Sequence, residues 1–363
     1  MKYIYLAIIL VFLNSCGGSS SSETNDTTPP DDYPETPQPL PDTKEPYEYQ
    51  QWYIEHNTTF YQQNGIDEDA HIHADNLLST YTGNGIKIAI IDDGLDVNHE
   101  DLQGALYKTY NVALDSTDVS HTDMYGFHGT ATTGIIGARA NGIGIRGIAP
   151  NAQIIFLKYS VYGTDSETIA LFDKAAEFGA DIISNSWGTY NVTPAVRDKI
   201  VDLSKNGRDG KGIVIVFASG NDDQDMGNDE SAIPEVIAVS ATDKENLRTY
   251  YSNYGVELDI MAPGGYHLGI TTLDDLGYKG LNSDDYSLYN SPNTFIGTSA
   301  SAPIVSALIA LMLEKNPNLT REEIDTLIKE NADKIGNVPY DEDGRNNYYG
   351  YGKINLSKIM SKI

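Results

Sequence analysis

"IKIAIIDDG", residues 86–94, is the stretch that decides the fold, because an uninterrupted apolar run ends there in two acids and a glycine. Isoleucine dominates the run, and β-branched residues favour strands. Four other stretches have the same character: AQIIFLKYS (152–160), ADIISNSWG (180–188), GIVIVFASGN (212–221) and PEVIAVSAT (234–242). Strands that are apolar on both faces are typical of parallel sheets covered by helices.

Helical patterns lie between these runs and after them. The expected helices are HGTATTGIIGARA (128–140), SETIALFDKAAEFGA (166–180), TPAVRDKIVDLSKNG (193–207) and TREEIDTLIKENAD (320–333). Gly179 is a stop signal, Pro194 suits a first turn, and Thr320 with Glu323 forms a capping box. The alternation predicts an α/β fold: a single doubly wound, mostly parallel sheet flanked by helices, in one domain over residues 47–363.

The composition is strongly acidic. Of 363 residues, 52 are Asp or Glu and 24 are Lys or Arg, which gives a net charge of −28. This charge argues against a nucleic-acid partner, since phosphates need cationic surfaces. Either a solvated surface or attraction of cationic substrates or Ca²⁺ accounts for the acids.

The first 46 residues do not resemble the rest of the chain. "MKYIYLAIILVFLNSC" has an early lysine and an apolar run too short to span a bilayer, which predicts a signal peptide over residues 1–15. Leu13, Ser15 and Cys16 resemble a bacterial lipobox, so we expect Cys16 to be lipidated and to anchor the protein in the cell envelope, at the outer membrane; ordinary export with cleavage nearby is the alternative. Residues 16–46 are rich in Ser, Pro and acids, which predicts a disordered tether.

Ser299 has an unusual setting. It lies in "FIGTSASAP" (295–303), directly before the apolar run Ile304 to Leu313, which predicts a buried helix. A serine at such a helix start is close to unpaired N–H groups and the positive end of the helix dipole, which suits a nucleophile whose attack creates an oxyanion. The alternative is an N-cap serine followed by a packing seam of small residues.

A nucleophilic serine needs a base, and the base needs an orienting acid. Asp92 follows an apolar strand, and His128 opens a helix. In parallel sheets such positions converge at the carboxyl ends of the strands.

The motifs "IIDDGLD" (90–96), "HGT" (128–130) and "GTSASAP" (297–303) resemble the active-site signatures of the subtilisin-like serine proteases, the S8 peptidase family. The likeness is densest toward the kexin/furin-like branch, in "DDG" (92–94), "NHEDL" (98–102), "QQW" (50–52) and "SNSWG" (184–188). The resemblance implies a serine endopeptidase acting through an acyl-enzyme. Ser299 would be the nucleophile, His128 the base, Asp92 its orienting acid, and Asn221 of "FASGN" (217–221) an oxyanion donor.

The resemblance also implies how a peptide substrate binds. Ser186, Trp187 and Gly188 would form one wall of a groove for an extended peptide, although core packing is the alternative for Trp187. The acids that the kexin/furin-like branch places after this wall are absent, since Thr189 to Asn191 stand there. Five acids follow Asn221 instead, which supports the hypothesis of a basic P1 residue: Asp222, Asp223, Asp225, Asp229 and Glu230.

Structural Ca²⁺ is a further implication of the resemblance. The loop "ARANGIGI" (138–145) would supply Asn141, and Asp101 and Glu45 would complete an oxygen cage; a glycine-rich turn is the alternative. The other histidines carry no motif: His56, His71, His73, His99, His121 and His267. His71 and His73 are spaced like a metal pair on a strand, but no cluster completes it, and His99 and His121 are expected in polar loops.

Two readings of the whole chain remain. The first is a lipid-anchored, monomeric endopeptidase that cleaves proteins or peptides and folds without an inhibitory prodomain, since residues 16–47 show no apolar periodicity. The second is a catalytically silent binding or scaffold lipoprotein with the same fold. All three triad residues are present with their glycines, which favours the first reading.

Overall fold

The computed structural model describes residues 45–74, 76–121, 127–160, 162–277 and 279–363. The expected signal peptide (1–15), Cys16 and all of the expected tether except Glu45 and Pro46 lie outside these residues.

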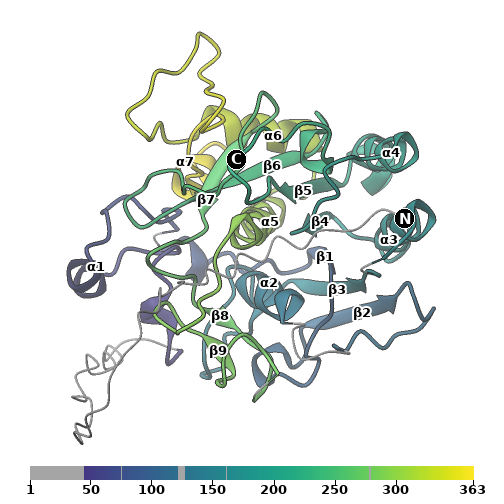
Figure 1. The fold of residues 1–363 in the computed structure, drawn as a ribbon, viewed down its shortest axis with the longest axis horizontal. Coiled ribbons are helices and arrows are strands. Elements are labelled where there is room, and N and C mark those ends of the chain that lie inside the picture. The colour runs from purple at the N-terminus through teal and green to yellow at the C-terminus, as the bar shows by residue number, and fades with distance from the viewer. Residues whose placement is uncertain (1–44, 75, 122–126, 161, 278) are drawn as a thin grey trace, which may run out of the picture.

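A seven-stranded parallel sheet forms the centre of the protein (Figure 1), in the order β2-β3-β1-β4-β5-β6-β7. Its strands are β1 (Lys87–Asp92), β2 (Leu106–Asn111), β3 (Gln153–Lys158), β4 (Ile182–Asn185), β5 (Val214–Ala218), β6 (Ile237–Thr242) and β7 (Ile260–Pro263). A short antiparallel pair, β8 (Thr272–Leu273) and β9 (Tyr286–Ser287), lies apart from it. The predicted α/β fold class is therefore confirmed.

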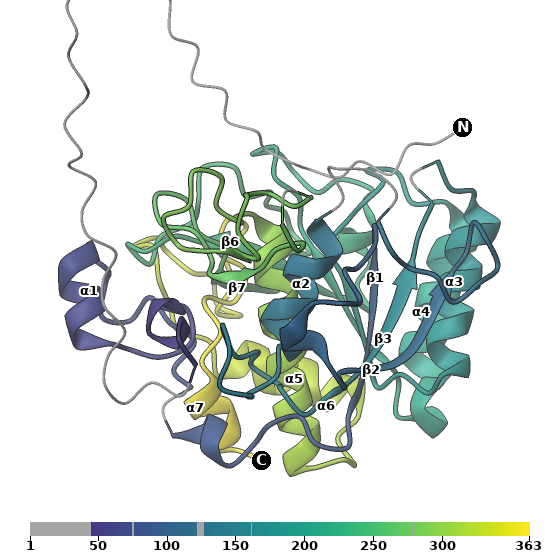
Figure 2. The ribbon, with the colours of Figure 1, turned by 90° about the horizontal axis from the view of Figure 1, so that it is seen from below.

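Apart from the half-exposed edge strand β2, the sheet is buried on both faces, as its continuous apolar strands predict. On β1, Ile88 and Ile90 belong to one hydrophobic core, while Ala89 and Ile91 belong to the other. Figure 2 shows α2 and α5 on one side of the strands and α3 and α4 on the other. Since successive side chains of a strand point to opposite faces, a strand between two helical layers has no polar face.

The helices are α1 (Thr58–Asn64), α2 (His128–Gly137), α3 (Asp165–Glu177), α4 (Pro194–Gly210), α5 (Thr298–Lys315), α6 (Arg321–Glu330) and α7 (Leu356–Met360). The sequence signals at their ends are confirmed: Pro194 opens α4, Thr320 and Glu323 form a capping box on α6, and Gly179 follows α3 with a φ of 79°.

The helix α5 passes through the middle of the molecule (Figure 1), and every residue from Thr298 to Leu313 is buried. Among the described residues, it alone has the length and apolar character to cross a bilayer, but 89% of it is buried inside the protein. Such burial is typical of a helix in a protein core. Because the core is closely packed, the residues at the start of α5 are held in place.

An N-terminal segment, residues 45–81, packs against parts of the chain far away in sequence. Trp52 Nε1 donates to the carbonyl of Gly269 at 2.9 Å, and the Tyr53 hydroxyl donates to that of Thr271. The amide of Leu356, the first residue of α7, donates to the carbonyl of Ile72 at 2.9 Å. Both tyrosine and tryptophan are fully buried, so this segment is part of the domain core.

Candidate active site

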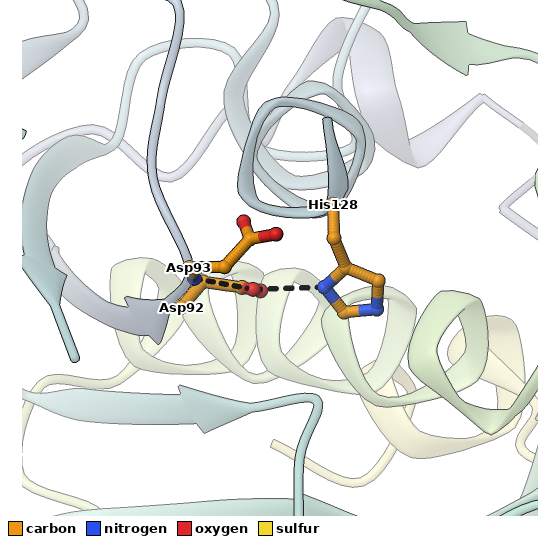
Figure 3. A group of neighbouring side chains, drawn as sticks. All are labelled: Asp92, Asp93 and His128. Carbon is orange, nitrogen blue, oxygen red and sulfur yellow. Dashed lines mark hydrogen bonds and ion pairs between the residues drawn. The ribbon is translucent and has the colours of Figure 1, made fainter. Parts of the chain in front are cut away.

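Asp92 and His128 meet at the carboxyl end of the sheet. Asp92 is the last residue of β1, whose two neighbours β3 and β4 lie on either side, and His128 is the first residue of α2. The imidazole Nδ1–H donates to Asp92 Oδ1 at 2.8 Å (Figure 3), and both side chains are buried. Thr132 Oγ1 donates to the other carboxylate oxygen at 3.0 Å. The carboxylate therefore fixes the imidazole tautomer with Nε2 as its free acceptor.

A second carboxylate lies beside this pair. Asp93 Oδ1 accepts the Gly129 amide at 2.9 Å, and Figure 3 shows its side chain alongside Asp92. Burial and the neighbouring Asp92 raise the pKa of Asp93 to about 7, against the opposing effects of His128, the Gly129 amide and Lys158. Burial lowers the pKa of His128, but the nearby Asp92 and Asp93 raise it by more, so the pKa of this imidazole is above its ordinary value.

Ser299 is in the first turn of α5, with only 5% of its surface exposed. The N-cap residue is Gly297, with a φ of 123° that favours glycine, so the alternative of an N-cap serine is wrong. Ser299 Oγ donates to the carbonyl of Ser186 at 3.3 Å and, within the described chain, makes no hydrogen bond to His128. Rotation about one side-chain bond redirects Oγ, and catalytic hydrogen bonds are often loose without substrate.

Asn221 lies next to the start of α5. Its side-chain Oδ1 accepts both the amide and the hydroxyl of Thr298, each at 2.9 Å. Thr298 Oγ1 in turn accepts the amide of Gly220 at 3.2 Å. Thr298 thus holds the carbonyl end of the Asn221 amide, and Asn221 and Ser299 line the same hollow. Thr298 is a positioning residue that the motif "GTSASAP" contained, but only the structure shows its partner.

A hollow beside Ser299 brings the predicted groove residues together. Its lining includes Ser186, Trp187, Gly188, Asn221, Asp229 and Ser299. Trp187 is 4% exposed and its ring packs edge-on against Phe217 at 5.3 Å, so it serves both the core and the wall of the hollow. The two interpretations of this residue are therefore compatible.

The five acidic residues behind the hypothesis of a basic P1 residue lie at different positions relative to the hollow. Asp229 lines the hollow and accepts the Tyr190 amide at 2.7 Å, while Glu230 accepts the amide and hydroxyl of Thr189 at 2.9 and 2.7 Å. Burial raises the pKa of Asp229, and burial and Asp229 raise that of Glu230 to about 7. Asp222 accepts the hydroxyl of Tyr190, which lines the hollow, and Asp223 pairs with Arg248. One of the five acids, Asp229, thus lies in the hollow's wall.

Glu45 and Asp101 are fully buried and lie close to the loop of Asn141. Neither carboxylate oxygen of Glu45, nor Oδ1 of Asp101, accepts a well-formed hydrogen bond in the described chain, although the Gly142 and Ile143 amides lie close enough to lower the pKa of Glu45. Burial is the larger effect on that pKa and raises it, and burial raises the pKa of Asp101 to about 6. Asp101 Oδ2 accepts the Ile145 amide at 3.1 Å. Buried carboxylate oxygens without a partner fit an oxygen-ligated cation such as Ca²⁺.

The remaining histidines have structural contacts. His71 Nδ1 accepts the His73 amide at 3.1 Å, and His73 Nε2 lies 3.3 Å from Asp333. His99 lies in a loop, as predicted, immediately before a short 3-10 helix (Glu100–Leu102), but its ring is fully buried and bonds to the Asp285 carbonyl at 2.8 Å. Among the described residues, three potential metal ligands converge only at Asp92, Asp93 and His128, where hydrogen bonds already engage them.

Comparison with known proteins gives one family. The model described as the subtilase family matches residues 83–352. The chain is 34% identical over 341 residues to a calcium-dependent protease of Trichormus variabilis, covering 85% of this chain and 50% of that protein. It is 31% identical over 287 residues to subtilisin E of Bacillus subtilis, covering 76% and 66%. The chain thus spans about half the length of the first of these relatives.

Solved structures share the fold. A serine protease of Aeromonas sobria superposes with a TM-score of 0.75 at 21% identity, over 89% of this chain and 68% of that one. A protease from Pseudoalteromonas arctica superposes with a TM-score of 0.72 at 23% identity, over 88% and 98%.

Proposed function

The chain belongs to the subtilase family, and from that premise we propose that it is a serine endopeptidase with Asp92, His128 and Ser299 as its triad. The observation that carries the proposal is the 2.8 Å bond between buried His128 and Asp92 at the carboxyl end of β1. A histidine held in one tautomer at the carboxyl ends of parallel strands is suited to general-base catalysis.

The proposed reaction begins when Ser299 Oγ turns from the Ser186 carbonyl to His128 Nε2. The imidazole takes the hydroxyl proton as Oγ attacks the scissile carbonyl, and Asp92 stabilises the resulting imidazolium. His128 then returns the proton to the leaving amine, which leaves an acyl-enzyme on Ser299. Water, activated by the same imidazole, releases the acyl group and regenerates the hydroxyl.

The developing oxyanion would lie between two donors. One is the backbone N–H of Ser299, which is in the first turn of α5 and needs no partner within the helix. The other is the side-chain NH₂ of Asn221, whose amide orientation Thr298 fixes. Donors that are already oriented need no reorganisation as charge develops.

The substrate would lie extended along Ser186, Trp187 and Gly188, with its P1 side chain in the hollow that Asp229 lines. A basic P1 residue is the finer proposal, because a buried carboxylate in the wall favours a cation over an apolar group. Cleavage of peptides that differ only at P1 tests it; preference for Phe or Leu over Arg rejects it.

A calcium ion is the cofactor we propose, held by Glu45, Asp101 and Asn141. Three buried carboxylate oxygens without a hydrogen-bond partner support it, both oxygens of Glu45 and Oδ1 of Asp101, while Asp101 Oδ2 accepts the Ile145 amide at 3.1 Å. When bound, the ion would neutralise these carboxylates and join the start of the domain to the loop after α2. Its role would be structural, since nothing places it near Ser299.

The cellular setting also belongs to the proposal. Cys16, followed by a polar stretch, supports a lipoprotein of the bacterial cell envelope at the outer membrane. "DDG" with "SNSWG" supports the kexin/furin-like branch. Mass spectrometry of the mature N-terminus tests the lipid on Cys16; an unmodified thiol, or cleavage elsewhere, contradicts it.

A catalytically silent scaffold is the second candidate, and the bond from Ser299 Oγ to Ser186 rather than to His128 favours it. Labelling with a fluorophosphonate distinguishes the two, because the reagent forms a stable adduct only with an activated serine. We expect the wild-type protein to be labelled and Ser299→Ala and His128→Ala not to be. Absence of label on the folded wild type would establish the scaffold.

A further inference from the structure

A second histidine–aspartate pair lies outside the proposed triad. His121 Nε2 is 3.4 Å from Asp275 Oδ1, and the two side chains are 7% and 2% exposed. The proposed reaction uses neither residue. Buried ionisable groups are rare unless they are paired and hydrogen-bonded, so this pair calls for an explanation.

Thr130 joins the pair to the helix that carries His128. Its hydroxyl donates to Asp275 Oδ1 at 2.5 Å, accepts the Asp96 amide at 2.9 Å and lies 3.4 Å from His121 Nε2. Thr130 is fully buried and lies two positions after His128, in the first turn of α2. Its hydroxyl therefore tethers the first turn of α2 to the Asp275 carboxylate.

The pair also contacts the segment that follows Asp92. A Cβ added to Gly94 would lie 2.5 Å from His121 Nδ1, so the imidazole packs directly on that backbone. A Cβ added to Gly129 would lie 2.1 Å from the Gly94 carbonyl oxygen, so the segment in turn packs on α2. His121 and Asp275 thus hold the two chain segments that carry Asp92 and His128 against each other.

Asp275 itself is fixed in place. It follows β8, where Thr272 Oγ1 donates to the carbonyl of Ala131 in α2 at 2.6 Å. The next residue, Leu276, donates its amide to Asp96 Oδ2 at 3.0 Å. The residues on both sides of Asp275 are therefore hydrogen-bonded to elements near the candidate active site, Thr272 to α2 and Leu276 to Asp96. Burial raises the pKa of Asp275 to about 7, against the lowering by Thr130, and Asp96, Asp274 and Asp93 add to the rise.

We propose that His121 and Asp275 are positioning residues, which act through Thr130 and Gly94 to hold His128 in line with Asp92 and Ser299. The proposal rests on the serine-protease function proposed above. Neither residue contacts the reacting atoms. Their loss would allow the first turn of α2 to shift, and a displacement of about 1 Å at a catalytic group costs on the order of 100-fold in rate.

Asp275→Asn tests the proposal, and Asp274→Asn is its matched control. Asp274 is adjacent and 1% exposed, and burial raises its pKa as well. In the described part of the chain, however, its carboxylate accepts amides from its own loop, those of Asp275, Leu281 and Asn282. We expect Asp275→Asn to lower kcat and the rate of fluorophosphonate labelling 10- to 100-fold with little change in KM, and Asp274→Asn to change neither by more than threefold. His121→Gln, which keeps Asp275, should fall between them.

A spectroscopic readout separates positioning from stability. The low-field proton resonance of His128 Nδ1–H reports the bond to Asp92 directly, and it should shift or broaden in Asp275→Asn and His121→Gln but not in Asp274→Asn. Equal loss of activity in both aspartate variants, or an unchanged resonance in Asp275→Asn, would overturn the inference. A wild-type protein that is not labelled at all would overturn the proposed function instead.

Discussion

The variant Glu45→Gln should be less stable than its parent protein in calcium, but at least as stable as the parent once calcium is removed. Glu45 is fully buried with both oxygens unpaired, close to the similarly buried Asp101. Without a cation these carboxylates are desolvated and repel each other, so Glu45→Gln removes an unfavourable charge. With a cation, the same change removes a ligand.

The magnitude follows from linkage. A ligand present at 100 times its dissociation constant adds about 2.7 kcal/mol to the free energy of unfolding. With an unfolding entropy of about 2.1 cal/mol/K per residue over about 300 residues, that corresponds to a rise in Tm of roughly 4 °C. In EDTA, Glu45→Gln should therefore be at least as stable as its parent, whereas in millimolar Ca²⁺ it should unfold roughly 4 °C below it.

Calorimetry on the Ser299→Ala background measures both states without self-digestion. Glu48→Gln is the control, because it makes the same charge change three residues away, at a half-buried carboxylate 3.9 Å from Arg146. It should keep the full response to calcium. If EDTA lowers the Tm of parent and Glu45→Gln equally, Glu45 is not a ligand and the reasoning fails.

Three further predictions concern catalysis and the core. Asn221→Ala should lower kcat by about 10²–10³-fold with KM nearly unchanged, which steady-state kinetics on a peptide amide checks; a change confined to KM would argue against an oxyanion role. Leu308→Ala, at a fully buried site in α5, should cost about 2–5 kcal/mol in urea unfolding, and a loss below 1 kcal/mol would be inconsistent with the packing. Burial lowers the pKa of Lys353 to about 8, although Asp333, Asp69 and Asp67 oppose this. An unfolded lysine titrates near 10.4, so above pH 8 the unfolded chain binds the extra proton and the free energy of unfolding should rise by up to about 1.4 kcal/mol per pH unit. Lys353→Met should abolish that slope, and a slope that persists would assign it to other groups.

The parts of the fold that the sequence predicts are those with an unambiguous pattern. The continuous apolar runs become β1, β3, β4, β5 and β6, and the capping box of α6 is present at Thr320. The edge strand β2 was not predicted, because "LYKTYN" (106–111) is half exposed and alternates weakly. The strand β7 is four residues long, and β8 and β9 are two each, too short for periodicity to distinguish them from loops.

The candidate site likewise has residues that the sequence identifies and contacts that it does not. Motifs identify Asp92, His128, Ser299 and Asn221, since each lies beside a glycine or at the end of a patterned element. The contact between Thr298 and Asn221 spans 77 residues, and that between Thr130 and Asp275 spans 145. Such pairs carry no local signal, because they depend on the tertiary fold alone. The orientation of Ser299 Oγ toward Ser186 is likewise a rotamer, which no pattern of residues encodes.

The N-terminal segment has a consequence for synthesis on the ribosome. Lys353 Nζ donates to the carbonyl of Asp69, 284 residues earlier in the chain. At about 5–20 residues per second, the two partners emerge roughly 15–60 s apart. For most of that interval Trp52 and Tyr53 lack their hydrogen-bond partners, the carbonyls of Gly269 and Thr271. Ser299 follows Asp92 and His128 in the sequence, so a nascent chain cannot assemble the proposed triad before Ser299 has been made.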